Sequence, residues 1–192
     1  MGQGFADLLH TSIVFDEFIR RICELRFLIV SLRLAQLNGK LYLMPSQFKE
    51  KCLAVEGELS GPIAITTTTI NHCQILQCCH ISCLIFIRTV LLGESHVMSK
   101  TLTTFGASLR AALEETDLTY SWSKLSKLLL WVLFMGSTAT SGGPLYSWYM
   151  DHFMRTAASL QLQNQDQCRD CLRKFLWLET MSQTQLQCCF KI

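Results

Sequence analysis

The stretch LSKLLLWVLFMGSTATSGGPLYSW, residues 125–148, decides the fold of this chain. It holds an almost unbroken apolar run over positions 128–135, then small residues, then Gly142-Gly143-Pro144. A helix that is apolar on every side is normally buried in a protein core or a membrane. A run of eight residues is too short for a bilayer, since a helical span needs roughly 20. We therefore expect a buried central helix that the double glycine ends, with Pro144 at the first position of the next helix.

The composition indicates one domain rich in core residues. The chain has 192 residues, of which 49% are hydrophobic and only 17% charged, and its net charge is +2. So few charged residues favour the interpretation that this chain is part of a larger helical assembly, because uncovered apolar area tends to attract a partner. The charges are scattered and no basic face is visible, so we expect no direct binding to nucleic acid. The ten cysteines, without a secretory leader pattern, favour a reduced, intracellular protein.

The hydrophobic periodicity predicts helices throughout the chain and no sheet. The prediction is an all-α fold, an irregular bundle of about six or seven helices around the central one. A segment of uncertain assignment, residues 1–60, is expected to precede the main helical region, residues 61–192. The expected helices besides the central one cover residues 5–37, 45–58, 71–92, 99–115, 144–162 and 164–180.

The second apolar helix, residues 71–92, contains polar groups that argue against a membrane span. They are Gln74, Gln77, His80 and Arg88, and a charge at the centre of a bilayer is costly. We expect this helix to pack among other helices, with Arg88 reaching the edge of the core or a carboxylate.

Four segments resemble the helical region of fungal-specific transcription factors, whose DNA-binding module is a six-cysteine binuclear zinc cluster. The central segment is LLLWVLFMGSTATSG followed by SWYMDHF. The others are SLRAALEETDL (108–118), CRDCLRKFLWLE (168–179) and CCHISCLIFIRTVLL (78–92). The similarity covers roughly residues 73–179. This resemblance implies a regulatory, protein-interaction domain that binds a protein partner or associates with itself. It also implies a location in the nucleus, or otherwise in the cytoplasm.

The DNA-binding module of that family has no counterpart here. The family places six cysteines around two zinc ions, in two halves that each begin with Cys-x-x-Cys. This chain has a single such pair, Cys168 and Cys171, and no second half at matching spacing. The DNA-contacting residues of the family therefore cannot be carried over to any position of this chain.

Two groups of residues are candidates for a metal site. Cys168 and Cys171 fall on one helix face, but zinc requires four ligands. His72, Cys79 and Cys83 fall within the apolar helix 71–92, where one helix could present two or three ligands. In both groups the cysteines are equally explained as small hydrophobic residues of the core, and we expect neither a metal nor a cofactor.

Aromatic side chains near the central helix could line a ligand pocket or a partner surface, or else form the core. They are Trp131, Trp148, Tyr149, Phe153 and Trp177. The chain shows no G-x-S-x-G motif and no glycine-rich phosphate loop, so we expect no enzyme. The alternatives are a small-molecule-binding helical protein, an enzyme of unknown chemistry, or a truncated gene product without function. A closed pocket holding a buried polar pair would favour the first two, and an open apolar groove would favour an interaction module.

Overall fold

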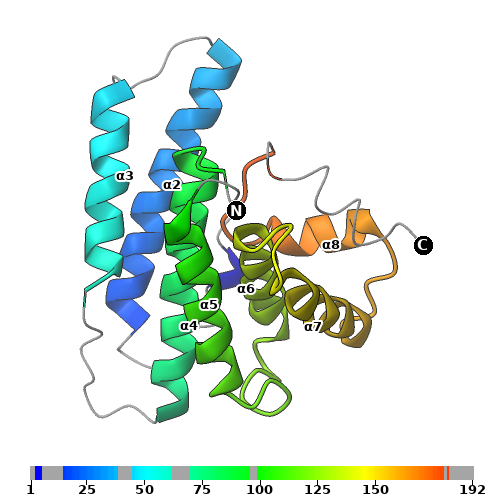
Figure 1. The fold of residues 1–192 in the computed structure, drawn as a ribbon. Helices are drawn as coiled ribbons and strands as arrows, with labels where there is room; N and C mark the ends of the chain where they lie inside the picture. The colour runs from blue at the N-terminus through cyan, green and yellow to red at the C-terminus, as the bar shows by residue number, and fades with distance from the viewer. Residues whose placement is uncertain are drawn as a thin grey trace.

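The computed structural model describes residues 3–5, 15–38, 45–61, 70–95, 99–179 and 181. These residues form helices and no strand, which confirms the predicted all-α fold (Figure 1). The elements are η1 (Gln3–Phe5), α2 (Phe15–Asn38), α3 (Pro45–Leu59), α4 (Ile70–Phe86), η2 (Ile87–Leu91), α5 (Lys100–Glu114), α6 (Ser126–Ala139), α7 (Tyr146–Ser159) and α8 (Gln165–Leu172).

Helix α6 is the buried centre of the fold. Every residue from Leu128 to its last residue, Ala139, is buried, and α6 contacts η1, α4, α5, α7 and α8. Tyr149 of α7 lies against Gly136, and its hydroxyl donates a hydrogen bond of 2.7 Å to the carbonyl oxygen of Gly106 in α5. One tyrosine therefore joins three helices at a point where α6 has no side chain.

The start of α7 differs from the prediction, and α7 also ends earlier, at Ser159. Helix α7 begins at Tyr146 rather than at Pro144, because the chain first turns through Gly142, whose φ is +73°, and Gly143, whose N–H donates to the carbonyl of Thr140. The side chain of Asn164 caps the start of α8 by accepting a hydrogen bond from the N–H of Gln167.

Helix α8 ends at Leu172 instead of continuing to residue 180. The reason is the next apolar run: Phe175, Leu176, Trp177 and Leu178 are all buried. Four successive residues cannot all face the core from one side of a helix, since helical neighbours are about 100° apart. The segment turns instead, and the indole N–H of Trp131 donates to the carbonyl of Leu176 at 3.1 Å.

Helix α4 packs against α3, α5 and α6 and ends in the π-helical turn η2. Arg88 of η2 pairs with Glu56 of α3 and with Glu94, each at 2.6 Å, which confirms the expected carboxylate contact. The stretch Cys73–Leu91 is long and apolar enough, by length and composition, to cross a membrane, and most of it is buried inside this fold.

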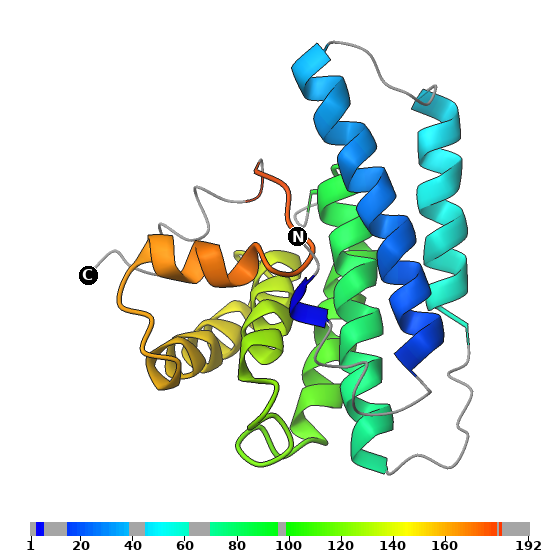
Figure 2. The same cartoon turned by 180° about the vertical axis from the view of Figure 1, so that it is seen from behind.

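Helices α2 and α3 form a hairpin along one side of the molecule. In both views the end of the hairpin that contains the carboxyl end of α2 projects beyond α4 and α5 (Figures 1 and 2). Helix α3 ends at Leu59, and the expected division between residues 1–60 and 61–192 stays a prediction. The predicted helix over residues 5–37 corresponds to η1 and α2; residues 6–14, and the four threonines 66–69, lie outside the described residues.

Candidate functional site

The large apolar side chains that the described residues expose are concentrated on the α2–α3 hairpin. The exposed fractions are 55% for Phe27, 51% for Val30, 80% for Leu37 and 40% for Leu53. Tyr120 is also exposed but lies in the loop before α6. We call the hairpin face the outward stripe of α2 that carries Phe27, Val30 and Leu37, together with the adjoining groove between α2 and α3, whose lining does not include Leu53.

Helix α2 carries two apolar stripes on different sides. The first is buried in the bundle and comprises Phe18, Ile22, Leu25 and Ile29. The second lies on the hairpin face, at alternating steps of four and three residues, and comprises Cys23, Phe27, Val30, Leu34 and Leu37. Among the described residues, packing therefore buries the first stripe, whereas the second is exposed except at Leu34, which is half-buried.

A groove of about 490 Å³ runs between α2 and α3. Leu28 and Val55 are buried in its lining, whereas Phe27, Lys51 and Ala54 line it as exposed residues. The ammonium group of Lys51 lies 5.5 Å from the centroid of the Phe27 ring, a cation–π contact that holds the ring at the groove. The groove is therefore apolar and open to solvent.

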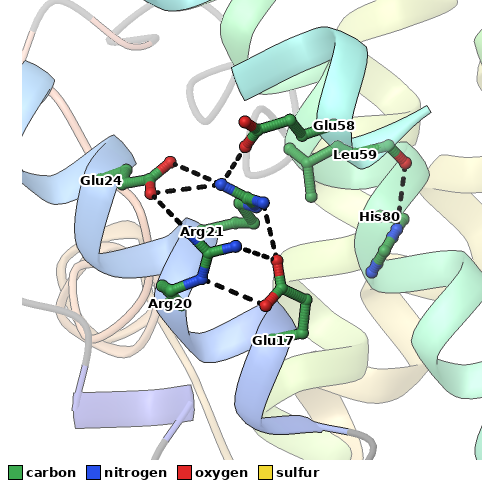
Figure 3. A network of polar contacts seen from close by, with 7 residues as sticks. All are labelled: Glu17, Arg20, Arg21, Glu24, Glu58, Leu59 and His80. Carbon is green, nitrogen blue, oxygen red and sulfur yellow. Dashed lines mark hydrogen bonds and ion pairs between the residues drawn. The ribbon is translucent and has the colours of Figure 1, made fainter. Parts of the chain in front are cut away.

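A charged network joins α2 to α3 at one end of the groove (Figure 3). Arg21, whose side chain is only 12% exposed, pairs with Glu17 at 2.7 Å, with Glu24 at 3.2 Å and with Glu58 of α3. Arg20 donates to Glu17, and this hydrogen bond lowers the pKa of Glu17 and raises that of Arg20. The carboxylates on this side of the groove are thus already neutralised within the chain.

His80 anchors the same end of the hairpin to α4. Its ring stacks on Phe18 with 5.2 Å between centroids, and its Nδ1 lies 3.0 Å from the carbonyl oxygen of Leu59 (Figure 3). Burial lowers the pKa of His80, so the ring is neutral at pH 7 and Nδ1–H donates to Leu59. The imidazole therefore connects α4 with the start of α2 and the end of α3.

The predicted metal ligands lie in the core or outside the described side chains. Cys79 and Cys83 are fully buried, and burial raises the pKa of each thiol well above its ordinary value. Cys168 and Cys171 are buried too, and burial raises the pKa of Cys168 to about 11. The side chain of His72 is not among those described. In the described part of the chain, no three His, Cys, Asp or Glu side chains gather where they could hold a metal.

Of the five predicted aromatic residues, four are buried in the core: Trp131, Tyr149, Phe153 and Trp177. Only Trp148 reaches the surface, where its ring contacts His152 and the guanidinium of Arg110. These side chains pack the bundle and do not form one surface. The hairpin face was missed at the sequence level, although the second stripe of α2 was a visible signal for it.

Comparisons with protein-family models, with curated proteins and with solved structures found no match to this chain. A function for it therefore has to be inferred from the hairpin face and the chemistry of its residues.

Proposed function

We propose that this chain is a helical protein-interaction module whose binding surface is the hairpin face. The observation that carries the proposal is the exposure of Phe27, Val30 and Leu37 along α2, beside the open groove that α2 forms with α3. Scattered apolar residues are normal on a protein surface, but a contiguous apolar patch with a polar rim is typical of an interaction site. Burying these side chains against a partner removes them from water and stabilises the complex.

The form of the groove favours a protein over a small molecule as the bound species. Small-molecule sites usually enclose most of the ligand surface. Here the lining residues Phe27 and Lys51 are exposed, and the apolar stripe continues along α2 as far as Leu37. An extended partner would cover both the groove and the rest of the stripe.

For the biological role, we propose transcriptional regulation in the nucleus through a protein partner and not through DNA. The support is the resemblance of residues 73–179 to the helical region of fungal zinc-cluster regulators, combined with the lack of the six-cysteine pattern. A chain that pairs with a full-length regulator but brings no DNA-binding module would act as a dominant negative.

The test compares the binding partners and the oligomeric state of the wild-type chain with those of the variant Phe27→Glu/Val30→Glu. Crosslinking in cells followed by mass spectrometry identifies the partners, and sedimentation measures self-association. Tyr120→Glu is the matched control, because Tyr120 is as exposed as Leu37 but lies off the hairpin face. We expect at least one partner, or self-association, that the double variant loses and the control keeps. Wild-type chain that is monomeric and partner-free, or identical partners for all three chains, would refute the proposal.

A further inference from the structure

We infer that the hairpin face receives an amphipathic helix of a partner protein, with apolar residues at heptad spacing and acidic residues along one flank. This inference rests on the proposed function and adds the class of the partner. Three features of the hairpin face support it: the spacing of the exposed stripe, the charges on its two flanks, and the poor match of the face to a second copy of itself.

The spacing of the exposed stripe is that of a helix-binding seam. Cys23, Phe27, Val30, Leu34 and Leu37 follow one another at steps of four, three, four and three residues. Side chains at this spacing are the a and d positions of a heptad, and they interlock with the same pattern on a second helix. A strand or an irregular peptide presents no matching period. Ala54 of α3, small and exposed beside the groove, permits close approach of a helix backbone.

One flank of the stripe carries cations that lack strong partners. Arg26 and Arg33 precede Phe27 and Leu34 and are seven residues apart, so they lie on the same side of the seam. Arg26 is exposed, and no ion pair joins it to any described carboxylate.

Arg33 is only weakly paired within the chain. Its Nη2 lies 3.6 Å from Glu179, beyond hydrogen-bond range, while Glu179 accepts a hydrogen bond of 2.8 Å from Arg173. The buried Nε of Arg33 has no hydrogen-bond partner among the described residues. An acidic residue on a bound helix would supply the carboxylate that this flank lacks.

On the opposite flank, toward α3, the exposed cation is Lys51, whose ammonium group lies over the Phe27 ring. Arg20 is engaged by Glu17 and Glu24, and the carboxylates of Glu24 and Glu58 are engaged by Arg21. The preference for an acidic partner therefore comes from Arg26 and Arg33 on one flank, with Lys51 as a third cation beside the groove.

A second copy of this chain fits the face less well. Two α2 helices packed antiparallel bring equivalent flanks together, which places Arg26 near Arg33 of the other copy. In a parallel pair the heptad places Arg26 opposite Ser31. Neither arrangement supplies a carboxylate, and like charges across a helix pair are unfavourable.

The experiment uses the full chain and three synthetic helical peptides of about three heptads with identical apolar seams. The peptides carry Glu, Gln or Lys at the flanking positions, and fluorescence anisotropy measures their affinity. We expect the Glu peptide to bind about tenfold more tightly than the Lys peptide, since two rim ion pairs contribute modestly. Arg26→Glu/Arg33→Glu should reverse this preference. Lys100→Glu/Lys124→Glu is the control: it changes the net charge by the same amount at exposed sites elsewhere, and it should keep the preference for the Glu peptide.

The possible outcomes separate this inference from the proposed function. If all peptides bind equally and Phe27→Glu/Val30→Glu abolishes binding, the acidic specificity is refuted and the interaction module stands. If no peptide binds but the chain self-associates through Phe27 and Val30, the occupant is a second copy and the inference is refuted. If no peptide binds and the chain is also monomeric and partner-free in cells, both proposals are refuted.

Discussion

Replacing Gly136 with alanine adds one methyl group to the last turn of α6, and we expect it to destabilise the protein. A Cβ at this position would lie 2.5 Å from both Cδ1 and Cζ of Tyr149, well inside van der Waals contact. The Tyr149 ring is fully buried, and its hydroxyl is held by the carbonyl of Gly106 at 2.7 Å. The ring can therefore move away from the methyl group only by breaking that hydrogen bond.

Opposing effects set the magnitude of this change. Alanine is favoured over glycine inside a helix by about 1 kcal/mol. Overpacking a close contact costs roughly 1–3 kcal/mol, and leaving a buried hydroxyl without its acceptor costs about 1–3 kcal/mol more. The packing effects dominate, so we expect a loss of about 3 kcal/mol in the free energy of unfolding. For a chain of this size that lowers the melting temperature by about 6–12 °C.

Urea unfolding followed by circular dichroism measures this loss, and Gly57→Ala is the matched control. A Cβ at Gly57, in the last turn of α3, would meet no atom within 4 Å, so this change should stabilise the protein by about 0.5–1 kcal/mol. If Gly136→Ala stabilises the protein as Gly57→Ala does, Tyr149 does not lie on Gly136 and the α6–α7 packing described above is wrong. Tyr149→Leu should recover part of the loss in the Gly136→Ala chain, since the two residues are in contact.

Three further predictions follow from the described contacts. Arg88→Met removes the cation from Glu56, whose side chain is 10% exposed. Because a nearly buried carboxylate is then left unpaired, the free energy of unfolding measured in urea should fall by about 2–3 kcal/mol. Adding Glu56→Gln should recover part of this loss, and no recovery would contradict this reasoning. Because burial lowers the pKa of His80, the unfolded chain takes up that proton first as the pH falls, so stability is full above about pH 6.5 and decreases below it. Unfolding measured between pH 7.5 and 5.5 should show a weaker decrease in stability for His80→Phe than for the wild-type chain; equal slopes for the two chains would refute the assignment to His80. Alkylation of the folded chain at pH 8 should modify the exposed Cys23 and spare the core thiols until the chain unfolds, because burial raises the pKa of these thiols. Peptide mass mapping measures the alkylation rate of each cysteine. Equal rates for Cys23 and for Cys78, Cys79 and Cys83 would contradict the burial of those three.

The buried centre of the fold was predictable because its residues permit only one environment. The run 128–135 is apolar on every side, so any stable fold has to bury it. The side chain of Asn164 caps α8, and such a cap depends on a local hydrogen bond that the sequence specifies directly. The carboxylate contact of Arg88 was predictable for a similar reason, because a charge beside a core needs a partner.

The end of α8 and the hairpin face depend on choices that local sequence leaves open. The segment FLWL, residues 175–178, suits a helix or a buried turn equally, and the acceptor that Leu176 offers to Trp131 decides between them. Helix α2 shows two apolar stripes, and only the tertiary arrangement shows which stripe the bundle covers. The cysteines posed the same difficulty, because a buried thiol and a metal ligand have the same residue type and spacing.

The two stripes of α2 allow folding and binding to be changed separately. Phe18, on the covered stripe, is fully buried and stacked on His80, so its truncation to alanine should cost about 3–5 kcal/mol. Phe27, on the exposed stripe, is 55% exposed and has a cation–π contact with Lys51, a contact that contributes only about 0.5–1 kcal/mol at an exposed site. A substitution at Phe27 should therefore leave the fold intact, and any loss of a partner that it causes can be attributed to the hairpin face.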